Sequence, residues 1–258
     1  MKEFIVRQEQ FQPIAVTAPD RHPLLFKLRC YVDVQLGSIV GHLKPALSKL
    51  TGKVLDVGAG ESPWRGWLSM DTEYYGIDVG NAGEFGMSSG RKDITYYDGR
   101  RIPFGDAQFD NAICIEVLEH AENPQLLLAE IARVLKPEGP FLLSVPWSAR
   151  RHHIPHDYHR FTRERLQIML SEVGFEDILI KERGSDIGVI ANKLTVLTIR
   201  LLRPARKTDF VWTGVLALLC TPLAVGFLIA TSVSDKLGRG ASEDPLGYFV
   251  SAVRGKSA

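Results

Sequence analysis

Short apolar runs of strand type alternate with longer runs of helical period between Thr51 and Ile180. One helical run, TRERLQIMLSEVGF, opens with the cap residue Thr162 and closes at Gly174. Strands that alternate with helices indicate βαβ units, so we expect an α/β fold, doubly wound, with a mostly parallel sheet covered on both faces. The predicted strands are Val54–Val57, Tyr74–Val79, Ile94–Tyr97, Asn111–Val117, Pro140–Val145 and Ile178–Lys181.

The N-terminal part has a different pattern. Residues 1–50 are expected to form a helical lead-in, of which LLFKLRCYVDVQLGSIVGHL is the amphipathic part. This lead-in would pack over the sheet edge or over the mouth of a site, and the pattern does not choose between them. The first ten residues, MKEFIVRQEQ, contain no apolar core of a signal peptide, so we expect a cytoplasmic protein.

Composition and charge narrow the class of protein. The chain has 258 residues, 45% of them hydrophobic and 24% charged, which is typical of a folded protein with a full core. A net charge of +1 gives no reason to expect nucleic acid as a partner. Three distant cysteines, Cys30, Cys114 and Cys220, argue against a disulfide framework and fit a reducing compartment.

The segment KVLDVGAGESPW places a glycine loop directly after the first predicted strand. The chain runs into Gly58-Ala59-Gly60 and is expected to turn toward a helix. Such a loop lets the backbone approach a ligand closely, because glycine has no Cβ and tolerates positive φ. Alone, this signal is weak, since ordinary turns also use glycine.

Acidic residues recur where the predicted strands end. Asp78 closes the strand after the glycine loop, where a carboxylate can accept ribose hydroxyls, and Asp98 and Glu116 end or follow the next two. Any one of them could be a helix cap, but together they predict a ligand site at the carboxyl edge of the sheet. A dinucleotide fits poorly, because Pro63 stands where its fingerprint needs a small residue and the acidic edge disfavours a pyrophosphate.

The motifs VLDVGAG, YYGIDV, DGRRIPFGDAQFDNAICIEVLEH and RVLKPEGPFLLSVP follow one another between about residues 50 and 182. In order and spacing they resemble the class I S-adenosylmethionine-dependent methyltransferases. The resemblance implies a Rossmann-like, seven-stranded sheet whose last strand, here Leu246–Arg254, is antiparallel and inserted. A methyltransferase domain would then comprise residues 51–186 and 242–258, with an apolar helical insertion at 187–241.

The same resemblance implies how S-adenosylmethionine would bind. Asp56, Gly58 and Gly60 would hold its methionine end. Asp78 would take the ribose hydroxyls and Asp98 the adenine amino group, with Arg100 or Ile102 near the ring. Glu116 would lie where the fourth strand opens on the methyl donor.

Four of the seven histidines fall in RRHHIPHDYHRFT, the segment that follows the fifth predicted strand. If the acceptor is a hydroxyl, a general base is useful, and our candidates are His156 first and His120 second. The segment could instead be a polar loop facing the substrate. A metal cluster of His152, His153, His156, Asp157 and His159 is a third reading, but Pro155 prevents one regular helix and no second cluster completes a zinc pattern, so we expect no metal.

The stretch Val211–Ser234 contains no charged residue and would measure about 36 Å as a helix, enough to cross a bilayer core. Pro222 is expected to break it into two short arms, and the chain must return to the sheet at Leu246–Arg254. We therefore expect a re-entrant hairpin that dips into one leaflet, supported by basic residues beside it, namely Lys193, Arg200, Arg203, Arg206 and Lys207. A buried dimer interface and a true membrane span are the alternatives.

These observations predict a methyltransferase that acts on a small or lipid-linked acceptor, of quinone, glycan or natural-product type, at the inner face of a membrane. The sequence does not choose among oxygen, nitrogen and carbon as the methylated atom. A non-catalytic scaffold of the same fold is the first alternative, and a nicotinamide oxidoreductase is the second.

Overall fold

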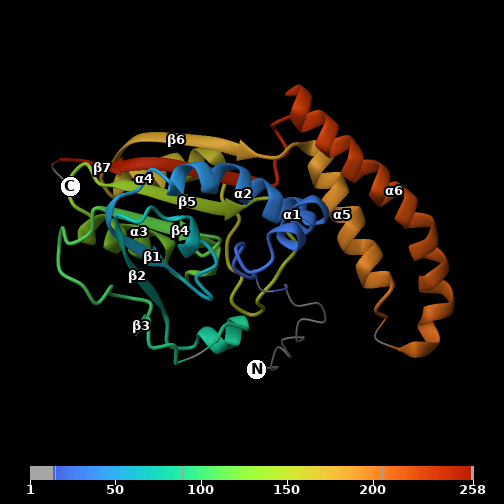
Figure 1. Ribbon diagram of the computed structural model, residues 1–258, viewed down its shortest axis with the longest axis horizontal. Helices are drawn as coiled ribbons and strands as arrows, with labels where there is room; N and C mark the ends of the chain where they lie inside the picture. Colours follow the sequence, from blue (N-terminus) through green and yellow to red (C-terminus); the bar gives the residue numbers. More distant parts are fainter. Residues whose placement is uncertain (1–13, 15, 89, 205, 257–258) are drawn as a thin grey trace, which may run out of the picture.

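The computed structural model describes residues 14, 16–88, 90–204 and 206–256, and its centre is a seven-stranded sheet (Figure 1). The strand order is β3-β2-β1-β4-β5-β7-β6. All neighbours are parallel except β7, which lies antiparallel between β5 and β6. The predicted α/β fold with an inserted last strand is confirmed. The strands are β1 (Gly52–Val57), β2 (Thr72–Val79), β3 (Ile94–Tyr97), β4 (Asn111–Ile115), β5 (Pro140–Pro146), β6 (Phe175–Arg183) and β7 (Gly247–Arg254).

Helices cover both faces of this sheet. Alternate residues of β4 show the two layers, since Cys114 packs toward α3 (Pro124–Val134) and α4 (Arg163–Glu172), whereas Ile113 packs toward α2 (Val34–Leu47). All five residues of β4 are buried, as a strand covered on both faces requires. The side chains that cap α3 and α4, Asn123 and Thr162, accept hydrogen bonds from backbone amides in the first turns.

The lead-in is helical over α1 (Pro23–Val32) and α2, as expected, while residues 1–13 and 15 lie outside the described residues. Helix α2 covers a face of the sheet rather than its edge. Its apolar positions Leu36, Leu43 and Leu47 pack against the strands. Burial of this apolar stripe, rather than intrinsic propensity, stabilises the helix.

One local prediction beside the glycine loop is wrong. The chain after the loop forms only the 3₁₀ turn η1 (Arg65–Trp67) instead of an α-helix, since Pro63 and Gly66 both disfavour helix there. After β4, His120 ends the 3₁₀ turn η3 (Leu118–His120), and helix α3 begins only after its cap residue Asn123.

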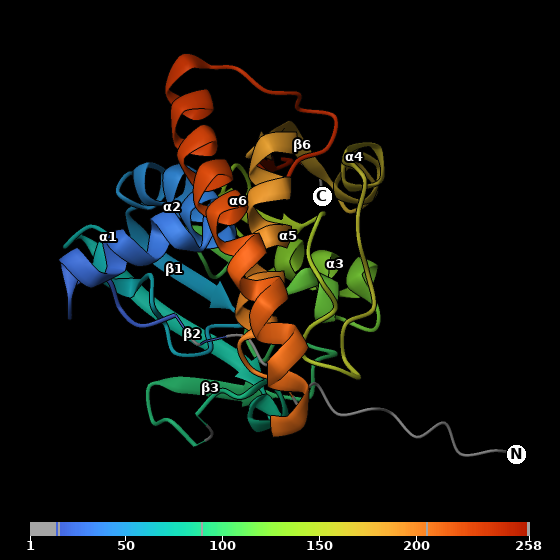
Figure 2. The same cartoon turned by 90° about the vertical axis from the view of Figure 1, so that its right-hand side faces the viewer.

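The insertion between β6 and β7 is a hairpin of two helices, α5 (Asp186–Leu201) and α6 (Phe210–Leu237), joined through the 3₁₀ turn η4 (Lys207–Asp209). Figures 1 and 2 show the two helices side by side, projecting from the end of the sheet. The predicted break at Pro222 is wrong, because α6 continues through it. A proline removes one backbone hydrogen bond, and the long helix on either side tolerates that loss. The chain reverses between the end of α5 and the start of α6 instead.

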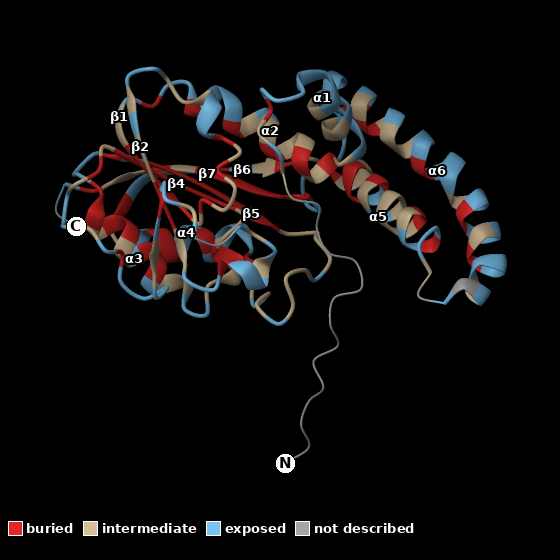
Figure 3. Ribbon diagram, turned by 60° about the horizontal axis from the view of Figure 1, so that its bottom comes forward, coloured by how far each residue is buried: buried red, intermediate tan, exposed pale blue. Residues whose placement is uncertain are grey.

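Helix α6 buries small and weakly polar side chains against the rest of the protein (Figure 3). These residues are Thr213, Ala217, Ala224, Thr231 and Ser234. Large apolar side chains lie on its outer surface, where Val211 is 79% and Leu218 is 74% exposed. Among the described residues, α6 is the one helix that is long and apolar enough to cross a membrane, judged by length and composition.

Candidate active site

A cavity of about 1550 Å³ opens at the carboxyl ends of β1, β2 and β4. It is bounded by the glycine loop, by the histidine-rich segment after β5 and by helices α2 and α5. All the site residues predicted from the sequence line it. They are Asp56, Gly58, Gly60, Asp78, Asp98, Glu116, His120 and His156.

The glycine loop requires glycine at its first position. Gly58 has φ 71°, and a Cβ there would lie 2.4 Å from a methyl carbon of Val117. The amides of Gly58 and Ala59 both donate to the carbonyl oxygen of Ile77, at 2.9 and 3.0 Å. The loop is thus held flat against the end of β2, and its backbone is exposed to the cavity.

Asp78 is fixed at the edge of this loop. Its Oδ2 accepts a hydrogen bond from the amide of Gly60 at 2.8 Å, and its Oδ1 accepts one from the amide of Val79 at 2.7 Å. Partial burial raises the pKa of Asp78, and the two amide bonds oppose this rise. Each carboxylate oxygen has a second lone pair, so this side chain can still accept from ligand hydroxyls.

Asp56 is only 3% exposed. The hydroxyl of Tyr74 donates to its Oδ2 at 2.7 Å. Burial is the main cause that raises the pKa of Asp56 to about 7, while the bond from Tyr74 lowers it. A cationic ligand group beside Asp56 would favour the ionised carboxylate.

Asp98 is exposed at the rim. Its Oδ1 accepts from the amides of Arg100 and Arg101 at 2.9 and 3.2 Å, and these bonds lower the pKa of Asp98. Of the two residues expected near an adenine ring, Arg100 lines the cavity. Ile102, the alternative to Arg100, is buried in the sheet core and does not line the cavity.

Glu116 takes part in a buried charge network that the sequence did not reveal. Its Oε1 accepts from the hydroxyl of Ser144 at 2.7 Å and from Nη2 of Arg183 at 2.8 Å. Arg183 is fully buried at the end of β6 and also donates to the Val145 carbonyl and the Ser38 hydroxyl. Because a buried charge needs such partners, Arg183 fixes Glu116 and links β6 to β5, to α2 and to the turn after β4.

The first candidate base, His156, lies beside a carboxylate. Its Nε2 is 2.7 Å from Oε2 of Glu84, and its Nδ1 is 3.1 Å from the hydroxyl of Tyr158. Phe85 packs beside the ring, with centroids 5.1 Å apart. A carboxylate at one ring nitrogen orients an imidazole and stabilises its protonated form.

The second candidate, His120, has a different environment. Its Nδ1 lies 2.7 Å from the carbonyl oxygen of His156. Burial, followed by the nearby His152, lowers the pKa of His120 to about 4. At neutral pH this imidazole is neutral and is a weak base.

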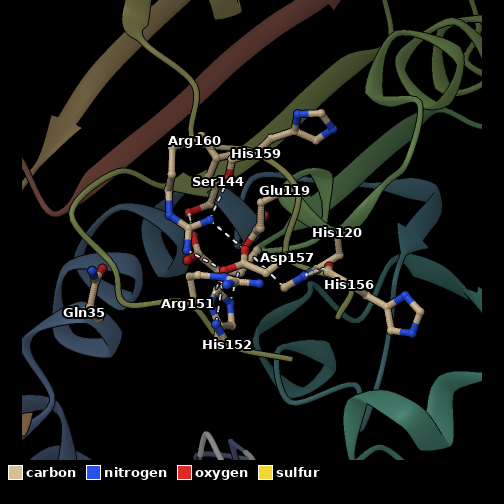
Figure 4. A network of polar contacts seen from close by, with 12 residues as sticks. Gln35, Glu119, His120, Ser144, Arg151, His152, His156, Asp157, His159 and Arg160 are labelled. Carbon is tan, nitrogen blue, oxygen red and sulfur yellow. Dashed lines mark hydrogen bonds and ion pairs between the residues drawn. The ribbon is translucent and has the colours of Figure 1, made fainter. Parts of the chain in front are cut away.

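Glu119, which the sequence analysis did not select, lies behind these histidines (Figure 4). It is fully buried, and among the described residues neither of its carboxylate oxygens has a hydrogen-bond partner. Burial raises the pKa of Glu119 well above its ordinary value. Its backbone carbonyl accepts from the amides of Tyr158 and His159, which holds the histidine-rich segment in place.

Helices α2 and α5 supply polar groups that sequence reasoning also missed. Thr195 of α5 and Gln35 of α2 line the cavity, and the Thr195 hydroxyl and the Gln35 Oε1 are buried without a hydrogen-bond partner in the described part of the chain. Val196 and Ile199 add an apolar surface from α5. This half of the cavity therefore combines apolar surface with a few polar groups, as sites for organic molecules do.

Comparison with known proteins identifies which part of the chain resembles a known family. Residues 55–143, from β1 to β5, match the family model described as a methyltransferase domain. The chain contains a methyltransferase domain. The predicted resemblance to the S-adenosylmethionine-dependent methyltransferases is thereby confirmed, and the α5–α6 hairpin lies outside the matched residues.

Individual relatives of the methyltransferase domain match over part of their length. The chain is 34% identical over 101 residues to an O-methyltransferase, cnsE, of Penicillium expansum, covering 35% of this chain and 37% of that protein. It is 30% identical over 117 residues to the O-methyltransferase rstn1 of Aspergillus nomiae, covering 41% and 52%. The match thus spans about a third to a half of these relatives.

Solved structures share the fold. A SAM dependent methyltransferase from Archaeoglobus fulgidus superposes with a TM-score of 0.53 and 17% identity, over 90% of this chain and 100% of that chain. At this identity the likeness concerns the arrangement of strands and helices and leaves the substrate open.

Proposed function

We propose that the protein is an S-adenosylmethionine-dependent methyltransferase that methylates a hydroxyl of an apolar, lipid-like acceptor. One observation carries the proposal. A single cavity joins the glycine loop and its acidic residues to the histidine-rich segment and to a wall of α5 in which Val196 and Ile199 lie beside Asn192 and Thr195. When bound, S-adenosylmethionine supplies a methyl group on a positively charged sulfur.

The carboxylates and glycines at the sheet edge suit this cofactor. Asp78 would accept the ribose hydroxyls and Asp56 would pair with the cationic amino group, while Gly58 and Gly60 let the backbone approach the methionine end. Asp98 would accept from the adenine amino group at the rim. Eight acidic residues of the described chain line this cavity, and they favour a neutral or cationic ligand and disfavour the pyrophosphate of a nicotinamide cofactor.

Alignment is the main task of the protein in methyl transfer, and holding two reactants together can supply roughly 7–11 kcal/mol of the barrier. We assign the removal of the hydroxyl proton to His156 rather than His120. Glu84, whose Oε2 lies 2.7 Å from Nε2, would orient the imidazole of His156, and a base of this kind is worth about 10²–10⁴ in rate. The named fungal relatives are O-methyltransferases, which supports oxygen as the acceptor atom.

The hairpin gives the reason to propose a lipid-like acceptor. Helix α5 lines the cavity, while α6 carries exposed apolar side chains, and Arg200, Arg203 and Arg206 are exposed near the tip. Apolar surface beside basic residues suits an anionic lipid surface, at about 1 kcal/mol per charge. Both ends of the insertion join one sheet, because β7 pairs with β5 and β6. We therefore propose that the hairpin dips into one leaflet without crossing it.

Calorimetric titration tests the cofactor and the surface together. Purified protein would be titrated with S-adenosylhomocysteine and, separately, with NADH, each with and without anionic liposomes. We expect micromolar binding of the first ligand, none of the second, and co-sedimentation with the liposomes. Binding of NADH without binding of S-adenosylhomocysteine would support an oxidoreductase instead. A stable dimer that does not bind liposomes would indicate that the exposed surface of α6 contacts a second copy of the chain.

Turnover distinguishes an enzyme from a scaffold of the same fold. Transfer of a labelled methyl group from S-adenosylmethionine to polar and apolar fractions of a lipid extract would be measured. We expect label in the apolar fraction, and a His156→Ala variant that binds S-adenosylhomocysteine normally but transfers slowly. Cofactor binding without any transfer would favour the scaffold.

A further inference from the structure

Three histidines from two separate segments meet at one point of the cavity wall. His120 comes from η3, and His152 and His153 come from the segment after β5. One ring nitrogen from each lies within 4.8 Å of one from each of the others. The ring centroids of His120 and His152 are 4.8 Å apart.

Two of these rings already have one nitrogen engaged with a backbone carbonyl. Nδ1 of His120 lies 2.7 Å from the carbonyl oxygen of His156, and Nδ1 of His152 lies 3.2 Å from that of Arg150. A carbonyl oxygen only accepts, so each Nδ1 donates its proton and each Nε2 keeps a free lone pair. Histidines that bind metals are oriented in this way by their second nitrogen.

Both Nε2 atoms face the buried carboxylate of Glu119. Its Oε1 lies 3.6 Å from Nε2 of His120 and 3.9 Å from Nε2 of His152. These distances are too long for hydrogen bonds, and in the described residues the carboxylate oxygens have no hydrogen-bond partner. With metal–ligand bonds of about 2.0–2.1 Å, the ligands of a tetrahedral zinc site lie about 3.3 Å apart. The two distances from Oε1 of Glu119 are therefore only slightly longer than the ligand spacing around one cation.

We propose that Glu119, His120 and His152 bind a divalent transition-metal ion of the zinc class, with His153 as a neighbouring fourth ligand. Two imidazoles and a carboxylate are a donor set that such ions accept. The histidines line the cavity and Glu119 lies behind them, so the side of the ion away from Glu119 faces the acceptor space. An acceptor oxygen could bind there. The site itself does not depend on methyl transfer and can be tested on the protein alone.

The test measures metal binding directly. Protein without a polyhistidine tag would be treated with a chelator, dialysed and titrated with Zn²⁺ by calorimetry and with Co²⁺ by visible absorption. We expect one ion per chain. His152→Ala and Glu119→Gln should each weaken binding at least about tenfold.

His159→Ala is the matched control, because His159 belongs to the same segment but its Nε2 lies 3.1 Å from the Ala121 carbonyl oxygen, away from the cluster. It should bind Zn²⁺ like the unchanged protein. Circular dichroism would check the fold of each variant, and His152→Gln replaces any variant that unfolds. No stoichiometric binding by the unchanged protein, or equal affinity in the His152 and His159 variants, would overturn the proposal.

Discussion

The sheet core buries its large apolar side chains, whereas the α5–α6 hairpin exposes many of them. In the core, Leu128 and Phe141 are fully buried between strands and helices. In the hairpin, Ala217 and Ala224 lie inside, whereas Leu218 is 74% exposed. The arrangement in the core is favourable in water, because burying large apolar side chains removes apolar surface from the solvent. Small residues inside and large apolar residues outside are typical of helices that pack in lipid.

The comparison therefore shows that similar hydrophobic residues serve two purposes in one chain. Those of the core stabilise the fold, and those of α6 expose apolar surface of the kind that marks an interaction site. Four experiments test this distinction.

The largest effect is expected from a core truncation. Leu128→Ala should lower the free energy of unfolding by about 2–5 kcal/mol, because it leaves a cavity in a close-packed interior. Leu218→Ala on the outer side of α6 should change it by less than about 0.5 kcal/mol. Urea unfolding without lipid measures both. Equal losses would mean that the outer face of α6 is buried in solution, for example by a second copy of the chain.

The next effect separates the two regions by function. Asp78→Ala should weaken S-adenosylhomocysteine binding by about 1.5–3 kcal/mol, or roughly 10- to 150-fold, through loss of charge-assisted hydrogen bonds. The control is Asp71→Ala, an exposed acid that comes just before β2, at its amino end. Calorimetry measures the affinity of both variants for S-adenosylhomocysteine. Normal affinity of the Asp78 variant would show that Asp78 does not bind the ribose hydroxyls.

A charge change at the hairpin tip should have a similar or smaller effect, and only on lipid binding. Arg203→Ser with Arg206→Ser should weaken co-sedimentation with anionic liposomes by about 2 kcal/mol, at about 1 kcal/mol per charge. Lys49→Ser with Lys92→Ser removes two exposed charges outside the hairpin and serves as the control. If both pairs lowered lipid binding equally, the attraction would be general and the hairpin would have no special part in it.

The smallest expected effect is a change in the number of protons released when the ligand binds. Asp56 has a pKa of about 7 without ligand, so near pH 6 it is mostly protonated. A cationic amino group beside it favours ionisation, so binding of S-adenosylhomocysteine should release close to one proton near pH 6 and close to none near pH 8. Calorimetry in buffers of different ionisation enthalpy counts the proton. Asp56→Asn should abolish the difference between the two pH values, and an unchanged proton count would dissociate Asp56 from the cofactor.

Much of the fold and part of the site were predictable from local pattern. Strand and helix periods depend on neighbouring residues, so the strands were found, and the inserted last strand followed from the family resemblance. The glycine loop and Asp78 were predictable because the loop follows the first strand directly and Asp78 lies a short, fixed number of residues later, at the end of the next strand. The break at Pro222 was predicted wrongly, since a local rule for proline was applied where a long helix outweighs it.

The order of strands and helices, the glycine loop with its acidic edge and the uncharged stretch of α6 follow from local sequence. The contacts between groups that are distant in the chain depend on how the elements pack. Arg183 reaches Glu116 from β6, and Glu119 and His120 meet His152 from a segment 32 residues later. These contacts depend on how the sheet brings strand ends together. No periodicity in the chain records them, because packing in three dimensions sets their distances.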